Sequence, residues 1–139
     1  MPQGSTAPAR RSVKILVVDD HPLVRRAVTS RLKIEPNFDV VAEAENGLEA
    51  VRKASELKPD VVVLDIIMPT LNGLEAARQI RNQHPEVAIV ILSSHAGRTF
   101  IEEAREIGAR AFVPKSHAAE ALVRAIQAAT QNGEFFAVE

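Results

Sequence analysis

The chain has 139 residues, of which 46% are hydrophobic and 25% charged, with a formal net charge of −1. This is the composition of an ordinary globular protein, and the length suits one domain rather than two. The near-neutral charge gives no sign of a broad basic surface for nucleic acid. The absence of cysteine excludes disulfides and thiolate chemistry, so a reducing cytoplasm is the expected compartment. No apolar run approaches a membrane span, and no membrane contact is expected.

The first predicted strand and helix follow a leader, residues 1–12, which has few apolar side chains to pack in a core. Residues 1–12 are rich in Pro, Ala, Ser and Thr, and we expect them to be flexible. The uncharged run 15–18 predicts a buried strand, which ends at the acids Asp19 and Asp20. Pro22 opens the next helix at a position where its missing N–H costs nothing.

The middle of the chain contains residues 61–64, the run on which the prediction of the fold is centred. Residues 38–43 alternate only partly, as expected of an edge strand. The helix after them is predicted to bury Ala50, Val51, Ala54 and Leu57. The uncharged residues 61–64 then predict a strand buried on both faces, which stops at Asp65. Pro69 cannot continue a ladder of hydrogen bonds, so the backbone is expected to turn out at the edge of the sheet.

Two further strands end in polar side chains. The apolar run 87–92 ends at Ser93, and the short strand 111–113 is followed by Pro114 and then Lys115. Ser116 is placed to cap the last helix. The inward face of that helix is predicted to consist of Ala119, Leu122, Ile126 and Ala129.

The order of these elements predicts a doubly wound α/β domain. Five strands alternate with five helices, and right-handed crossovers place such strands in one parallel sheet that is covered on both faces. With the second strand at an edge, the expected order is 2-1-3-4-5, that of the flavodoxin-like class. The domain is predicted to span residues 13–133, with 134–139 as a tail or the start of a linker.

The polar side chains at the strand ends predict a metal and phosphoryl site. Asp19, Asp20 and Asp65 would converge in one crevice and repel one another unless a cation joins them. Ligation by oxygen alone favours Mg²⁺, which prefers a phosphate to complete its shell. Ser93 offers a hydroxyl and Lys115 a compact positive charge to such a phosphoryl group.

Each of these residues also has an ordinary structural interpretation. Asp20 and Ser93 could cap helices, and Lys115 could be a solvated surface charge. The coincidence of all of them at the ends of neighbouring parallel strands favours the functional interpretation.

The motifs at these ends resemble those of response-regulator receiver domains, over residues 13 to about 131. They are VVDDHP at 17–22, LDIIMPTLNG at 64–73, LSS at 92–94 and FVPK at 112–115. The resemblance implies that Asp65 is the phosphoacceptor. It also implies that Asp20, Asp65 and the backbone carbonyl of Ile67 ligate Mg²⁺, with Asp19 close by.

The same resemblance implies a switch. Ser93 and Lys115 would contact the phosphoryl group, and Ser93 would move toward it. The Phe112 ring would fill the space that Ser93 leaves and so change a surface formed by the fourth helix, the fifth strand and the fifth helix. Core packing alone is the other interpretation of Phe112.

The resemblance further implies partners rather than an enzymatic activity of the chain's own. A sensor histidine kinase would supply the phosphoryl group, and the phosphorylated protein could form a homodimer. The motifs are similar to the branch that precedes LuxR-type helix-turn-helix domains, so output through transcription is expected, with DNA bound only by a C-terminal domain absent from this chain. The alternative is a stand-alone phosphorelay receiver or a scaffold. A phosphatase of the haloacid-dehalogenase type does not fit, because its Asp-x-Asp motif is missing after the first strand.

Overall fold

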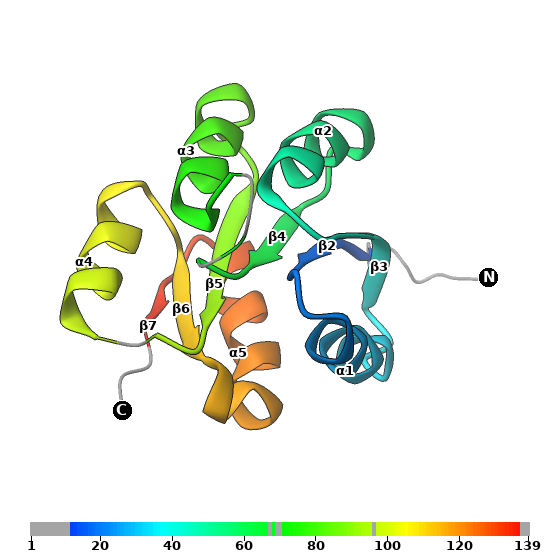
Figure 1. The fold of residues 1–139 in the computed structure, drawn as a ribbon. Coiled ribbons are helices and arrows are strands. Elements are labelled where there is room, and N and C mark those ends of the chain that lie inside the picture. Colours follow the sequence, from blue (N-terminus) through cyan, green and yellow to red (C-terminus); the bar gives the residue numbers. More distant parts are fainter. Residues whose placement is uncertain (1–11, 67, 69–70, 96, 137–139) are drawn as a thin grey trace.

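The computed structural model describes residues 12–66, 68, 71–95 and 97–136, and the elements are labelled as in Figure 1. The first half of the chain contains β2 (Val13–Val18), α1 (Pro22–Lys33), β3 (Phe38–Ala44), α2 (Gly47–Leu57), β4 (Val61–Leu64) and α3 (Gly73–Gln83). The second half contains β5 (Ala88–Ser93), α4 (Arg98–Glu106), β6 (Ala111–Pro114), the 3-10 helix η2 (Lys115–His117), α5 (Ala118–Thr130) and β7 (Phe135–Phe136). Strands and helices therefore alternate along the chain, as the sequence predicts.

The strands form one parallel sheet in the order β3-β2-β4-β5-β6-β7. The first five strands of this order are those expected from the sequence, and their arrangement confirms the predicted order 2-1-3-4-5 and the doubly wound fold. The sixth, β7, was not expected. Phe135 and Phe136, which fall in the segment expected to be a tail or the start of a linker, pair with Ala111 and Phe112 of β6.

The sheet is covered by helices on both faces, which is why its inner strands carry no polar alternation. Helices α1 and α5 lie on one face, and α2, α3 and α4 lie on the other (Figure 1). Successive residues of β2 point to opposite faces, so Ile15 packs toward α1 and α5 whereas Leu16 packs toward the other helices. Both side chains are fully buried. The carboxyl ends of all these strands lie at one edge of the sheet, where the site is built.

Three expectations about individual helix residues were wrong. Leu57 at the end of α2 is 41% exposed, and Ala119 in the first turn of α5 is exposed rather than inward. Ser116 lies within η2, so the N-cap position of α5 falls to His117. Leu57 is the last residue of α2 and Ala119 the second of α5, so both lie in a terminal turn, whereas Ser116 is taken up by the 3-10 turn that precedes α5.

The longest described helix, α5, has 13 residues, whereas about 20 apolar residues are needed to cross the hydrocarbon core of a bilayer. Within the described part of the chain, no helix is therefore long and apolar enough to span a membrane.

Candidate phosphoryl and metal site

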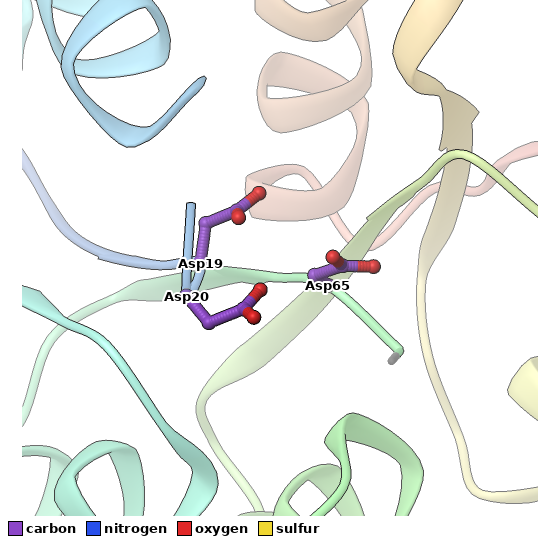
Figure 2. A group of neighbouring side chains, drawn as sticks. All are labelled: Asp19, Asp20 and Asp65. Atoms are coloured by element: carbon purple, nitrogen blue, oxygen red, sulfur yellow. The ribbon is translucent and has the colours of Figure 1, made fainter. Parts of the chain in front are cut away.

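Three carboxylates lie together at the carboxyl edge of the sheet. Asp19 and Asp20 follow β2, and Asp65 follows β4, which is the neighbouring strand. The backbone N–H of Asp65 donates to the Val18 carbonyl at 3.2 Å, so the ladder between the two strands continues up to the site. Figure 2 shows the side chains of Asp19 and Asp20 directed toward the end of β4, where Asp65 lies. One oxygen from each carboxylate lies within 4.8 Å of the others.

Lys115 offsets the charge of the two buried acids. Asp19 is 2% exposed and Asp65 5%, whereas Asp20 is exposed to solvent. The Lys115 Nζ lies 2.8 Å from Asp19 Oδ2 and 3.0 Å from Asp65 Oδ2. Burial of the ammonium acts to lower the pKa of Lys115, but the hydrogen bonds and charges of Asp19 and Asp65 outweigh it, and the pKa is raised above its usual value. The lysine is therefore a lasting positive charge against the carboxylate of Asp65.

The position of Lys115 follows from β6 and the proline that ends this strand. Pro114 is the last residue of β6 and pairs with Ser93 of β5, so the residue after it emerges at the edge where the carboxylates lie. The 3-10 turn η2 then begins at Lys115 itself. The structure thus brings Lys115 to Asp65 as the sequence predicts.

Arg25, which the sequence analysis did not identify, contacts the backbone of Asp19. The Arg25 Nη1 donates to the backbone carbonyl of Asp19 at 2.7 Å, and its Nε donates to Glu43 Oε1 of β3 at 3.0 Å. The Asp19 carboxylate also accepts the N–H of His21 at 2.9 Å. Arg25 thereby joins the end of β2 to the neighbouring edge strand. The sequence offers no signal that distinguishes Arg25 from the adjacent Arg26, which is exposed.

Gly73 allows the helix after β4 to begin against the backbone of Asp65. The Gly73 N–H donates to the Ile66 carbonyl at 2.6 Å. A Cβ at position 73 would lie 1.8 Å from the carbonyl oxygen of Asp65, closer than any side chain can approach. Only glycine therefore permits this turn. Ile67, whose carbonyl was predicted to be a metal ligand, lies outside the described residues, so that assignment stays a prediction.

Ser93 and Phe112 are both fully buried. The Ser93 hydroxyl accepts the N–H of His95 at 3.0 Å. The Phe112 ring already lies in the core on the side of α3 and α4, in the cluster that contains Ile101. The Phe112 ring is thus buried in this structure, and its movement into the space left by Ser93 upon phosphorylation stays a prediction.

The donor set of the site fits a hard divalent cation. The three acids Asp19, Asp20 and Asp65 offer only oxygen, and among the described residues no histidine or cysteine joins them in this cluster. Two of the acids are buried and share a single lysine, so a second cation would relieve the remaining negative charge. Mg²⁺ takes few carboxylates and keeps several waters, which suits a site with one exposed acid.

Fold and site together define a class of protein. A doubly wound parallel sheet in this strand order, with acids and a lysine at its carboxyl edge, is the flavodoxin-like arrangement with polar groups where such sheets bind ligands. Residues 15–127 match the response regulator receiver domain family, and the chain belongs to this family.

Individual relatives agree with the family match. The chain is 36% identical to the transcriptional regulatory protein DegU of Brevibacillus brevis, over 88% of this chain and 52% of DegU. It is 40% identical to the chemotaxis protein CheY of Listeria monocytogenes, over 86% of this chain and 99% of CheY. Among solved structures, a LuxR-family two-component response regulator from Aurantimonas sp. SI85-9A1 is 38% identical with a TM-score of 0.86, over 89% of both chains. The chain thus spans about half the length of DegU and nearly all of CheY.

Proposed function

We propose that Asp65 is the phosphoacceptor of this receiver domain. The observation that carries the proposal is the ammonium of Lys115, 3.0 Å from Asp65 Oδ2, at a carboxylate grouped with two further acids. A positive charge held there offsets the negative charge that a phosphoryl group brings to a buried carboxylate. The phosphoryl donor is a phosphohistidine of a sensor histidine kinase. The protein acts in the cytoplasm.

Three residues of this chain take part in the proposed transfer. An oxygen of Asp65 forms a bond to phosphorus while the N–P bond of the phosphohistidine breaks, and the released imidazole takes up a proton. Lys115 contacts the phosphoryl oxygens as negative charge develops on them, and the Ser93 hydroxyl donates to one of them. The transferred group then stays on Asp65 as an acyl phosphate until water attacks the same phosphorus.

Mg²⁺ would be held by Asp20 and Asp65, with Asp19 close by and the Ile67 carbonyl as a further ligand. When bound, the ion offsets the charge of the carboxylates and of the incoming phosphoryl oxygens. The contact of Arg25 with the Asp19 carbonyl supports this assignment, because it fixes the loop that carries Asp20. The residues of the chain thus prepare the site before the ion or the phosphoryl group arrives.

The output is proposed to be transcriptional. The relatives include two transcriptional regulatory proteins, of which this chain spans 52% and 55% of the length, and DNA binding by this protein would belong to a part outside these residues. The second candidate is a stand-alone phosphorelay receiver, which is favoured by the 99% coverage of CheY. A phosphorylation-dependent homodimer is compatible with either.

Phosphorylation at Asp65 can be tested with acetyl phosphate and Mg²⁺, followed by measurement of the intact mass. We expect one added phosphoryl group that is stable in acid and lost in base, and no addition in Asp65→Asn or in the presence of EDTA. Asp60→Asn is the matched control, because Asp60 lies just before the same strand at its opposite end. Labelling that persists in Asp65→Asn would rule out the assignment.

A further inference from the structure

The turn between β3 and α2 lies between the two parts of the chain that carry the acids. On one side, the carbonyl of Ala44, the last residue of β3, accepts the Asp19 N–H at 3.1 Å. On the other side, Gly47, the first residue of α2, lies against Leu71, which closely precedes α3. The turn is therefore in contact with the chain that follows β2 and with the chain that follows β4.

The contact between Gly47 and Leu71 leaves no space for a side chain at position 47. A Cβ there would lie 2.1 Å from the carbonyl oxygen of Leu71 and 2.8 Å from its Cβ. Neither atom is the flexible end of a side chain, so the backbone itself would have to move to admit a methyl group. Glycine is therefore required by the close approach of two segments that are far apart in the sequence.

The start of α2 is fixed by its own hydrogen bonds and by its packing. The Asn46 side chain accepts the N–H of Glu49 at 2.8 Å, and the Glu49 carboxylate accepts the N–H of Glu45 at 2.9 Å. Ala50 and Ala54 of this helix are fully buried in the core, and α2 and α3 lie side by side on one face of the sheet (Figure 1). A methyl group at position 47 would therefore displace Leu71 rather than α2.

The segment 71–73 leads from this contact to Asp65. Gly73, the first residue of α3, lies against the backbone of Asp65, where a Cβ would lie 1.8 Å from the carbonyl oxygen. Residues 71–73 are thus in close contact with Gly47 at one end and with Asp65 at the other. A displacement of Leu71 is therefore passed to the backbone that carries the Asp65 carboxylate.

We propose that Gly47 is a positioning residue of the phosphoryl site. Because Gly47 has no side chain, the turn after β3 can hold residues 71–73 against Asp65. These residues in turn fix the backbone of Asp65 relative to the acids that follow β2. The proposal rests on the proposed function, since a role in positioning Asp65 for phosphoryl transfer requires that Asp65 accepts the phosphoryl group.

A shift of Asp65 would change both the cation site and the contact with Lys115. One oxygen from each of the three carboxylates lies within 4.8 Å of the others, and the Lys115 Nζ lies 3.0 Å from Asp65 Oδ2. Movement of one acid away from the other two would leave a cation with a poorer set of ligands. A methyl group at position 47 should therefore weaken Mg²⁺ binding and slow phosphorylation.

Calorimetric titration of the unphosphorylated protein with Mg²⁺ tests the proposal. We expect Gly47→Ala to weaken Mg²⁺ binding roughly tenfold, as the loss of groups that orient metal ligands generally does. Ala54→Gly is the matched control, because it destabilises the same helix and leaves the contact between Gly47 and Leu71 in place. Its Mg²⁺ affinity should stay close to that of the wild type, and urea denaturation measures how much stability each variant has lost.

The outcomes separate this proposal from the proposed function. Equal Mg²⁺ affinities of the Gly47→Ala and Ala54→Gly proteins would overturn the positioning role of Gly47. A wild-type protein that binds Mg²⁺ but takes up no phosphoryl group from acetyl phosphate would count against the proposed function instead.

Two variants of Leu71 test the same path from its other side. Leu71→Ala and Leu71→Gly lose the same apolar contacts beyond the Cβ, but only Leu71→Gly also loses the Cβ beside Gly47. We expect Mg²⁺ binding to be roughly threefold weaker in Leu71→Gly than in Leu71→Ala, because glycine lets the backbone adopt conformations that do not hold Asp65 in place. Equal affinities of these two proteins would contradict the proposal even if Gly47→Ala did not fold.

Discussion

Lys115 holds together the buried carboxylates of Asp19 and Asp65, which would otherwise repel each other. It contacts Asp19 at 2.8 Å and Asp65 at 3.0 Å, while Asp20 remains exposed to solvent. Because these contacts raise the pKa of Lys115 above its usual 10.5, the ammonium is protonated throughout the neutral range. The charge that a phosphoryl group requires is therefore in place at physiological pH without any rearrangement.

Arg25 provides a prediction about the cation site. Its contacts with the Asp19 carbonyl and with Glu43 fix the turn that carries Asp20. Removal of the Arg25 guanidinium should therefore leave Asp20 in the site but hold it less firmly. We expect Arg25→Gln to weaken Mg²⁺ binding roughly tenfold, as the loss of groups that orient metal ligands generally does. Calorimetric titration of the unphosphorylated protein measures this affinity directly.

The adjacent Arg26 supplies the control for that measurement. Arg26 is exposed, so Arg26→Gln makes the same change of charge without touching the turn. Its Mg²⁺ affinity should stay close to that of the wild type. If both variants lost affinity equally, the effect of Arg25 would be one of general charge, and its positioning role would be disproved.

At the scale of single elements, the beginning of α3 sets the shape of the site. Gly73 starts this helix where a Cβ would lie 1.8 Å from the Asp65 carbonyl oxygen. We expect Gly73→Ala to lower the free energy of unfolding by about 3 kcal/mol, because the backbone of Asp65 must move to admit the methyl group. Urea denaturation followed by circular dichroism measures the loss.

A second glycine at a helix start serves as its control. Gly97 is the N-cap of α4, and a Cβ there would meet no atom within 4 Å. Gly97→Ala should cost less than about 1 kcal/mol, the difference between glycine and alanine at an N-cap. Comparable losses in the two variants would show that the close approach at Gly73 is not what requires glycine.

The elements differ in how well the sequence specifies them. Residues 15–18 of β2 and the whole of β4 and β5 are uncharged runs, and Pro22 marks the start of α1, so pattern alone predicted these elements. Strand β7 has two residues, and no periodicity can be read from so short a segment. It exists because β6 presents a free edge and α4 presents Arg105 nearby, and both are consequences of the tertiary fold.

The site shows the same division between pattern and tertiary structure. Asp19, Asp65 and Lys115 follow strands that pattern predicts, and parallel strands bring their carboxyl ends together. The contact of Arg25 with Asp19 depends on how α1 lies against β3, which no local signal encodes.

At the scale of the whole molecule, the fold connects a reactive edge to a surface on its flank. The acids and Lys115 lie at the carboxyl edge of the sheet, and the covered edge of β6 lies at its side (Figure 1). In helix α4, the ring of Phe100 lies 5.5 Å from the His95 ring, and Arg105 lies over the ring of Phe136 in β7.

Chemical trapping tests most directly whether Asp65 accepts the phosphoryl group. After incubation with acetyl phosphate and Mg²⁺, borohydride reduces an acyl phosphate on aspartate to homoserine, and peptide sequencing by mass spectrometry then locates the reduced residue. We expect homoserine at position 65 alone, and none when EDTA is present. Homoserine at position 19 or 20, with aspartate intact at position 65, would contradict this expectation.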